Sequence, residues 1–281
     1  MSVVQPIGSF IPIDSEGYLV NPCDISLVTS PWIEVVEVVK DAYLNQLGEQ
    51  LVHSLYLRGS VAKGSAIAGI SDIDTFCVVF SEGTKLKKAW KKKFQKTVVE
   101  QFPFQTGVEM WCIPLDIVLH KPSANAIRAT IKTQSICLWG EDLSLQLPAY
   151  KLGKGLIAHS PGLKKEIDEV LETLPEMTSS TDIKSECQWI MKRIVRAAFE
   201  LVMAAEQSYT RDLYPCYSAF VKYFPEKSVQ MQQALEWAIA PTDVASDIVQ
   251  YLRSFAPWLT AATAKLVRSL DGSPKRVRIL Y

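Results

Sequence analysis

The stretch LRGSVAKGSAIAGISDIDTFCVVF, residues 57–80, decides the fold of this chain, because it joins two strand-like segments through a turn rich in glycine and serine. Asp72 and Asp74 stand at the start of the second segment, on either side of Ile73. Successive side chains of a strand point to opposite faces, so we expect both carboxylates on one face and Ile73 on the other.

The closeness of Asp72 and Asp74 creates a charge problem, because two adjacent carboxylates repel each other unless a cation or a hydrogen-bond network neutralises them. Hard oxygen ligands suit Mg²⁺ or Mn²⁺, and Mg²⁺ takes its remaining ligands from water and substrate phosphates. The pair therefore predicts a divalent metal and a phosphate-bearing substrate. The alternative is that Ser71 and Asp72 close a turn and Asp74 merely begins an edge strand.

The glycine-rich turn before the carboxylates departs from the phosphate-binding P-loop. Gly59 and Gly64 have the P-loop spacing, but Ser65 occupies the lysine position and no helical pattern follows. What remains is a strand that ends at Gly59 and Ser60, whose amides and hydroxyl are suited to phosphate oxygens.

The composition is that of a globular protein, with 281 residues, 48% of them hydrophobic and 21% charged. Lys+Arg and Asp+Glu are equal at 30 each, so there is no overall basic excess that would indicate a long nucleic acid as partner. The N-terminus lacks a signal-peptide pattern and no window is apolar enough for a membrane span, which predicts a cytoplasmic protein with no membrane partner. The six cysteines and three histidines are scattered, which disfavours a zinc site, a disulfide framework and a hydrolytic triad.

Hydrophobic periods divide the chain into a mixed half and a helical half. The first half predicts helices within residues 30–50, 83–102 and 123–138, and strands within 54–59, 74–80 and 108–120. The second half predicts helices alone, within residues 162–174, 182–205, 213–224, 229–239 and 243–270. We therefore expect an α+β protein, with a mixed-sheet domain in residues 1–150 and an all-α bundle in residues 151–281.

Three motifs, taken in order, resemble the nucleotidyltransferase superfamily with the DNA polymerase β-type palm. They are Gly59-Ser60, then Gly69-x-Ser71-Asp72-Ile73-Asp74, then Asp116 inside the apolar segment LDIV. The resemblance covers residues 50–120 and implies that the first two acids bind two divalent ions and that the third completes the site from a neighbouring strand. It implies transfer of a nucleoside monophosphate, AMP being favoured, from a nucleoside triphosphate to a hydroxyl group, with release of pyrophosphate.

The resemblance and the bottom-up chemistry together assign the site. Asp72, Asp74 and Asp116 are the predicted catalytic residues and ligands of two Mg²⁺ ions, with Mn²⁺ as a substitute. The predicted nucleotide-binding residues are Gly59, Ser60, Lys63, Ser71, Lys192 and Arg196. Lys192 and Arg196 are neighbours on a predicted helix, where a solvated face is the alternative. The alternative for Asp116 is that a neighbouring backbone group or cation pairs with it for structural reasons. An unpaired carboxylate among apolar residues would be costly, which favours the functional role.

The acceptor is the least determined part of the reaction. The two-domain layout resembles antibiotic nucleotidyltransferases such as the aminoglycoside adenylyltransferases, and also minimal nucleotidyltransferases paired with HEPN-type helical domains. No histidine follows His159, which disfavours the HEPN ribonuclease motif. A small aminoglycoside-like acceptor is favoured, with Glu109 as a contact or base unless it merely faces outward; dispersed further candidates are Trp111, Glu186, Trp189 and Tyr209.

Other acceptors and other roles stay open. Seven lysines between Lys85 and Lys96 form either a solvated helix face or a track for RNA. A protein side chain is a further possible acceptor. A non-catalytic, nucleotide-binding regulatory module is the alternative to an enzyme, and the complete set of three acids favours catalysis.

Overall fold

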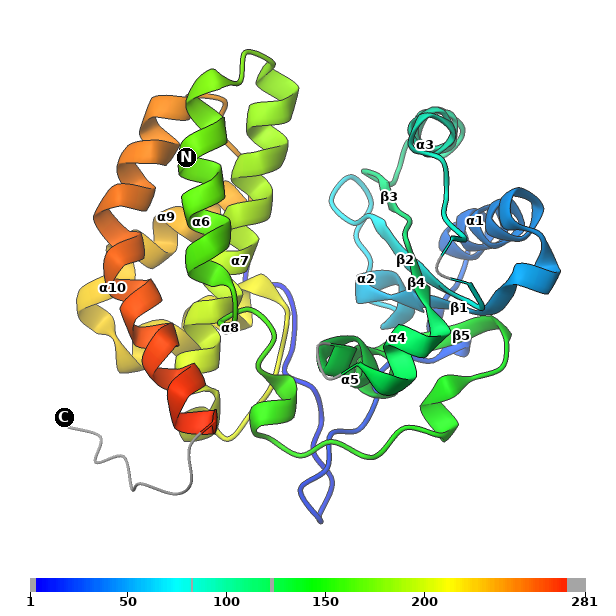
Figure 1. Cartoon of the computed structure of the whole chain (residues 1–281), viewed down its shortest axis with the longest axis horizontal. Helices are drawn as coiled ribbons and strands as arrows, with labels where there is room; N and C mark the ends of the chain where they lie inside the picture. The colour runs from blue at the N-terminus through cyan, green and yellow to red at the C-terminus, as the bar shows by residue number, and fades with distance from the viewer. Residues whose placement is uncertain (1–3, 82, 122–123, 272–281) are drawn as a thin grey trace. The chain divides into compact units, whose positions relative to one another are not determined.

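The computed structural model describes residues 4–81, 83–121 and 124–271, and these form two compact units. The sheet unit is Pro12–Lys151, and the helical unit joins the described parts of Met1–Ile11 and Leu152–Tyr281 (Figure 1). The predicted α+β class with a helical C-terminal part is confirmed. The division differs from the predicted one at the N-terminus, since residues 4–11 belong with the helices rather than with the sheet.

The sheet unit is built on a mixed sheet of order β3-β2-β1-β5, with β4 also paired to β2. Strand β1 runs antiparallel to β2 and β5, whereas β3 and β4 run parallel to β2. The strands are β1 (Val52–Arg58), β2 (Ile73–Val79), β3 (Val108–Glu109), β4 (Cys112–Pro114) and β5 (Ser135–Gly140). The helices are α1 (Trp32–Leu47), α2 (Gly59–Ala62), α3 (Lys88–Gln101), α4 (Leu115–His120) and α5 (Asn125–Gln134).

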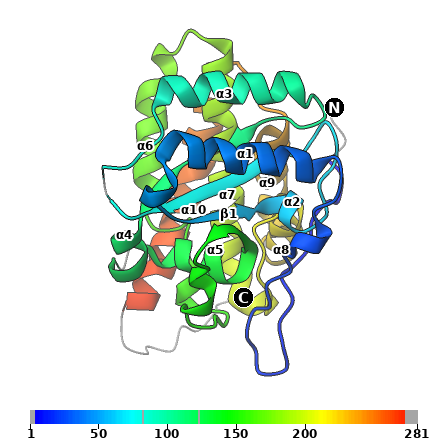
Figure 2. The same cartoon turned by 90° about the vertical axis from the view of Figure 1, so that its right-hand side faces the viewer.

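Helices pack on both faces of this sheet, because alternate strand residues are apolar on each side. Leu57 of β1 is buried in one cluster with Val39 of α1 and Val98 of α3, and Figure 2 shows α1 in front of β1. Tyr56, the preceding residue of β1, joins a second cluster with Val118 of α4 and Ile131 of α5. The face that carries Tyr56 is the one that matters for the site below.

The helical unit is a bundle around one long central helix, α7 (Ser180–Glu206). The others are α6 (Leu163–Thr173), α8 (Leu213–Tyr223), α9 (Ser228–Ile239) and α10 (Ala245–Asp271), and all four pack against α7. Their positions confirm the helices predicted for this half. The N-terminal segment is tied to the bundle, since the Phe10 ring contacts the Phe199 ring and the amide of Ile11 donates to the carbonyl of Tyr209.

Two predictions of secondary structure in the sheet unit are wrong. The second part of the strand predicted at 108–120 is helix α4, in which Leu115 and Val118 are one turn apart and reach the same core cluster. The helix predicted to Leu138 ends at Gln134, because the Ser135 hydroxyl donates to the carbonyl of Thr130 and the apolar run that follows pairs with β1 as β5. The predicted start of that helix, Ser123, lies outside the described residues.

Among the residues that the structure describes, none of the helices combines the length and the apolar composition that a membrane crossing requires.

Candidate active site

Charged side chains gather at one end of the sheet, across three neighbouring strands. Asp74, the second residue of β2, is paired in register with Glu109 at the end of β3 and with Arg58 at the end of β1. Asp72 comes two residues before Asp74, directly ahead of the strand. The pairing therefore brings together three carboxylates and one guanidinium that are far apart in sequence.

The alternation predicted for this stretch is present. Asp72 and Asp74 are half-buried, whereas Ile73 between them is fully buried in the cluster beneath α1. Asp74 shares its face with Phe76, two residues further along the strand, whose ring stacks on Trp111 with 5.0 Å between centroids. Aromatic packing thus supports the apolar part of this face, and the carboxylates lie at its polar end.

The Arg58 guanidinium lies between two of the carboxylates. Its Nη2 is 2.6 Å from Oε2 of Glu109 and 3.1 Å from Oδ1 of Asp74. The side chains of Arg58 and Asp74 are both 19% exposed, and that of Glu109 is 46% exposed. The sequence does not single out Arg58, because there it is only the last residue of a predicted strand. Its position opposite Asp74 follows from the pairing of β1 with β2.

Glu109 has the titration behaviour of a crowded carboxyl group. Burial, a hydrogen bond with Asp74 and the negative charges of Asp74 and Asp72 raise its pKa to about 7, against the opposing effect of Arg58. A carboxyl group with a pKa near neutrality is suited to accept a proton from a reacting group. Glu109, a weak candidate in the sequence, therefore joins Asp72 and Asp74 at the centre of the site.

Gly59 begins the turn that follows Arg58, and its conformation leaves no choice of residue. Its φ is +79°, and a Cβ at this position would come within 2.4 Å of Oδ2 of Asp74. Glycine is therefore required both by the backbone angle and by the close approach of the chain to the carboxylate. The turn therefore lies directly against one carboxylate of the acidic pair.

The two serines of the motifs hold the turn against the acidic loop. The Ser60 hydroxyl donates to the Ser71 hydroxyl at 3.0 Å, and Oγ of Ser71 also accepts from the amide of Ile67 at 2.9 Å. Ser60 and Gly59 form the first residues of the short helix α2, and Lys63 follows its last residue. In the sheet unit, Gly59 thus lies against Asp74, Ser60 contacts Ser71, and Lys63 follows on the same turn.

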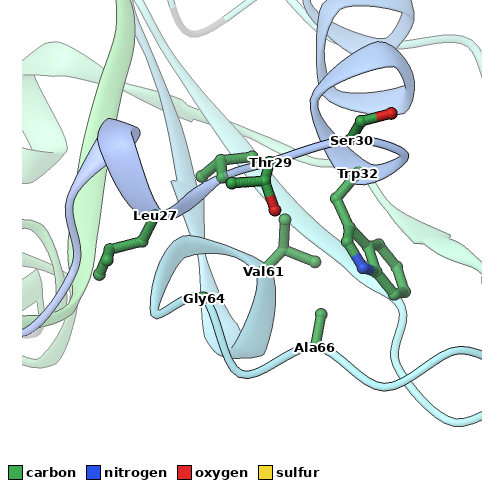
Figure 3. Close-up of a pocket in the computed structure, with 8 residues that line it drawn as sticks. Leu27, Thr29, Ser30, Trp32, Val61, Gly64 and Ala66 are labelled. Atoms are coloured by element: carbon green, nitrogen blue, oxygen red, sulfur yellow. The ribbon is translucent and has the colours of Figure 1, made fainter.

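A small cavity lies on the other side of this turn (Figure 3). Its volume is about 130 Å³, and it is lined by Leu27, Val28, Thr29, Ser30, Trp32, Val61, Gly64 and Ala66. Ligand pockets for drug-sized molecules are typically about 300–1,000 Å³. This cavity is therefore too small for a nucleoside triphosphate, and the acidic strand ends remain the better candidate.

Asp116 does not lie on a strand beside the acidic pair. It lies in α4, its side chain is 63% exposed, and Oδ1 is 2.8 Å from Nδ1 of His120, one turn further along the helix. The prediction of a carboxylate enclosed in an apolar strand is wrong, because Leu115, Ile117 and Val118 are spaced for a helix whose outer face accepts Asp116. The residue brought to Asp74 by the sheet is Glu109.

The predicted basic residues of the second half lie in the helical unit, on α7. Nε of Arg196 donates to the carbonyl of Arg211 at 3.0 Å, and Lys192 stands one turn earlier. Arg193, between them, forms an ion pair with Glu166 of α6 at 2.6 Å. Arg193 therefore joins two helices, whereas a nucleotide role for Lys192 and Arg196 stays a prediction.

The remaining acceptor candidates fall into different environments. Trp189 on α7 is exposed, and burial raises the pKa of the nearby Glu186. Tyr209 is buried in the helical unit and Trp111 is stacked in the sheet unit, so both contribute to packing. In the lysine run, Lys91 donates to the carbonyl of Met110; the exposed members are Lys85, Lys87, Lys88, Lys92, Lys93 and Lys96.

The turn at Gly59 and Ser60 and the acidic pair lie inside a range that matches a sequence family. Residues 38–106 match the family model of the nucleotidyltransferase domain. The chain carries a nucleotidyltransferase domain. The matched range includes Gly59, Ser60, Asp72 and Asp74 but ends before Glu109 and Asp116, so the position of the third acid rests on the geometry of the sheet.

Known structures support the same fold for the nucleotidyltransferase domain and the helices that follow it. One is the crystal structure of a spectinomycin adenyltransferase from Enterococcus faecialis with ATP and spectinomycin. It has a TM-score of 0.50 and 13% sequence identity, and the match covers 83% of this chain and 99% of that one. A search of curated proteins finds no significant match. The predicted resemblance to the polymerase β-type nucleotidyltransferase superfamily is confirmed.

Proposed function

We propose that this protein transfers a nucleoside monophosphate, AMP in the favoured case, from a nucleoside triphosphate to an acceptor hydroxyl. The observation that carries the proposal is the meeting of Asp72, Asp74 and Glu109 at the strand ends, beside the Gly59–Ser60 turn. The oxygen of the acceptor hydroxyl forms a bond to the α-phosphorus, the bond from that phosphorus to the bridging oxygen breaks, and pyrophosphate leaves. The family match supports nucleotidyl transfer in general.

The donor set fits a divalent metal. Asp72 and Asp74 provide hard carboxylate oxygens, and their charges are among the causes that raise the pKa of Glu109, as expected of a cluster with an excess of negative charge. Within residues 4–81, 83–121 and 124–271, no group of three or more metal-ligating side chains stands ready-made. The two carboxylates support Mg²⁺ or Mn²⁺ as the proposed ion, whose remaining ligands would be phosphate oxygens and water. When bound, the metal would supply positive charge to the triphosphate.

The third acidic role passes from Asp116 to Glu109 in this proposal. A nucleophilic hydroxyl must lose its proton as it attacks phosphorus, and Glu109 has a pKa raised to about 7. Its carboxylate is next to Asp74 and half-exposed, so an acceptor hydroxyl can approach it. Glu109 is therefore the proposed general base.

The turn is the proposed phosphate-binding element. The chain passes close to Asp74 at Gly59, and the backbone amides of this turn are the proposed donors to phosphate oxygens. The Ser60 hydroxyl, which donates to Ser71, would join them by rotating toward the phosphate. Lys63 follows on the same turn and contributes positive charge. Ser71 holds Ser60 in place. The nucleotide-binding role of Lys192 and Arg196 stays a proposal from the sequence.

The proposed acceptor is a small hydroxylated molecule of the aminoglycoside-like class. The spectinomycin adenyltransferase with a similar fold was solved with ATP and a small-molecule antibiotic, which supports this class without identifying the compound. An RNA end is the second candidate, favoured by the exposed lysines of the run from Lys85 to Lys96. Cytoplasmic location stays a prediction.

The experiment is pyrophosphate release with Mg²⁺, each of the four ribonucleoside triphosphates, and a panel of aminoglycosides, aminocyclitols and RNA 3′ ends. With the productive pair, Asp72→Asn, Asp74→Asn and Glu109→Gln are each expected to lower kcat/KM by about 100-fold or more. Asp116→Asn is the matched control, since its exposed side chain is expected to leave kcat/KM within about threefold.

The outcomes separate the alternatives. Loss of activity in Asp116→Asn with full activity in Glu109→Gln would return the third acidic role to Asp116. If no acceptor supports turnover while calorimetry still shows binding of Mg-nucleotide that depends on Asp72 and Asp74, the protein is a non-catalytic nucleotide-binding module.

A further inference from the structure

Arg58 is a cation built into the acidic site. It is the last residue of β1, it lies opposite Asp74 in the sheet, and its Nη2 contacts both Asp74 and Glu109, at 3.1 Å and 2.6 Å. Only 19% of its side chain is exposed. A guanidinium is therefore held at the place where two acidic side chains converge.

This burial has an energetic reason. Removing a guanidinium from water costs free energy that is recovered only through well-placed acidic partners, and here each of the two partners accepts a short contact. Without a cation, Asp74 and Glu109 would repel each other across neighbouring strands. Arg58 thus does for these two carboxylates, in the metal-free protein, what a metal ion would otherwise do.

We propose that Arg58 is a positioning residue which neutralises Asp74 and Glu109 in the metal-free site and which a divalent cation must displace from Asp74 in order to bind. The inference rests on the proposed function, because it takes Asp74 as a metal ligand. Two cations that share one carboxylate weaken each other's binding, and this coupling acts equally in both directions.

The neighbourhood of Arg58 gives the displaced guanidinium a new partner. Gly59 and Ser60, the proposed phosphate-binding turn, follow Arg58 directly in the chain. Phosphate oxygens are strong partners of a guanidinium. The site is therefore built to admit the metal weakly alone and more tightly together with a triphosphate, whose negative charge receives the released arginine.

The test is binding of Mn²⁺ alone to the full-length protein, followed through the electron paramagnetic resonance signal of free Mn²⁺. Arg58→Met removes the competing charge and is expected to bind Mn²⁺ at least about tenfold more tightly than the parent protein. In EDTA the same variant is expected to unfold at least about 2 °C lower, because two carboxylates lose their cation. Arg253→Met, a change at an exposed arginine of α10, is the matched control and is expected to alter neither quantity.

Equal Mn²⁺ affinity in Arg58→Met and the parent protein would overturn the proposal. A comparison with Asp72→Asn/Asp74→Asn separates this failure from failure of the proposed function. If the double variant binds Mn²⁺ as the parent does, the metal site itself is wrong; if it loses Mn²⁺ while Arg58→Met is unchanged, only the countercharge role is wrong.

A measurement on the unaltered protein decides the matter if Arg58→Met does not fold. Dicarbonyl reagents modify accessible guanidinium groups, and peptide mass spectrometry locates the modified arginine. Arg58 is expected to react faster in Mn²⁺ than in EDTA, with Arg253 unchanged. Equal reactivity of Arg58 in the two conditions would contradict displacement.

Discussion

At the scale of single residues, Gly59 shows how closely the backbone approaches the acidic site. Gly59→Ala places a Cβ about 2.4 Å from Oδ2 of Asp74 and keeps a φ of +79°, so either the turn or the carboxylate must move. We expect a loss of about 1–3 kcal/mol in the free energy of unfolding, together with loss of Mg-nucleotide binding. Gly69→Ala is the control, because it has the same φ with nothing within 4 Å of the added Cβ. Urea denaturation measures the free energy of unfolding, and calorimetry measures Mg-nucleotide binding. Equal effects of Gly59→Ala and Gly69→Ala would show that the close approach to Asp74 is unimportant.

His159 supplies a second prediction at this scale. It is buried among Arg211, Arg196 and Arg193, and burial followed by these positive charges lowers its pKa well below the ordinary 6.5. Below pH 6.5 His159 is therefore protonated in the unfolded chain but stays neutral in the folded protein. The contribution of His159 to the free energy of unfolding is highest above this pH and decreases as the pH is lowered.

The variant that tests this is His159→Asn, which keeps an acceptor for the Arg193 Nη1 donor found 2.7 Å from Nδ1 of His159. Its unfolding free energy is expected to fall less than that of the parent between pH 7.5 and 5.5, by up to about 1.4 kcal/mol per pH unit. Urea titrations at both pH values provide the comparison. Parallel losses in the two proteins would contradict a neutral His159.

At the scale of elements, α1 fixes the position of the strands that carry the acids. Tyr43 of α1 is fully buried. Its hydroxyl oxygen accepts hydrogen bonds from the amide of Trp111 at 3.0 Å and from the Thr75 hydroxyl at 3.3 Å. Tyr43→Phe leaves the Trp111 amide without this acceptor, whereas the Thr75 hydroxyl keeps the carbonyl of Glu109 at 2.7 Å. We therefore expect a loss of about 1–3 kcal/mol in the free energy of unfolding and faster exchange of the Trp111 amide. Denaturant titration and hydrogen exchange check both. An unchanged Trp111 amide would show that α1 does not hold the segment after Glu109.

At the scale of the whole molecule, the N-terminal residues belong to the helical unit although the next residues begin the sheet unit. Phe10 is 38% exposed and contacts Phe199 of α7, so Phe10→Ala is expected to cost about 1–2 kcal/mol, less than for a fully buried phenylalanine. Hydrogen exchange should show weaker protection in α7 and around Tyr209, with β1 and β2 unchanged. Loss of protection in the strands instead would contradict the assignment of residues 4–11.

Local patterns were sufficient for most of the fold and for half of the site. The alternation around Ile73 placed Asp72 and Asp74 on one face, and the spacing of apolar residues located the helices of the bundle, because both properties depend on neighbours a few residues apart. The same local information failed at Asp116, since a short apolar segment has the composition of a strand or of a helix.

The tertiary structure alone decided which groups lie around Asp74 in the candidate site. Arg58 and Glu109 meet Asp74 because the pairing of β1, β2 and β3 sets them in register. The residues between them in the sequence do not indicate this register. The raised pKa of Glu109 likewise depends on burial and on charges brought from other strands. Sequence by itself determined the acidic pair and the glycine turn, which are local; the third carboxylate and its countercharge were decided by long-range backbone hydrogen bonding.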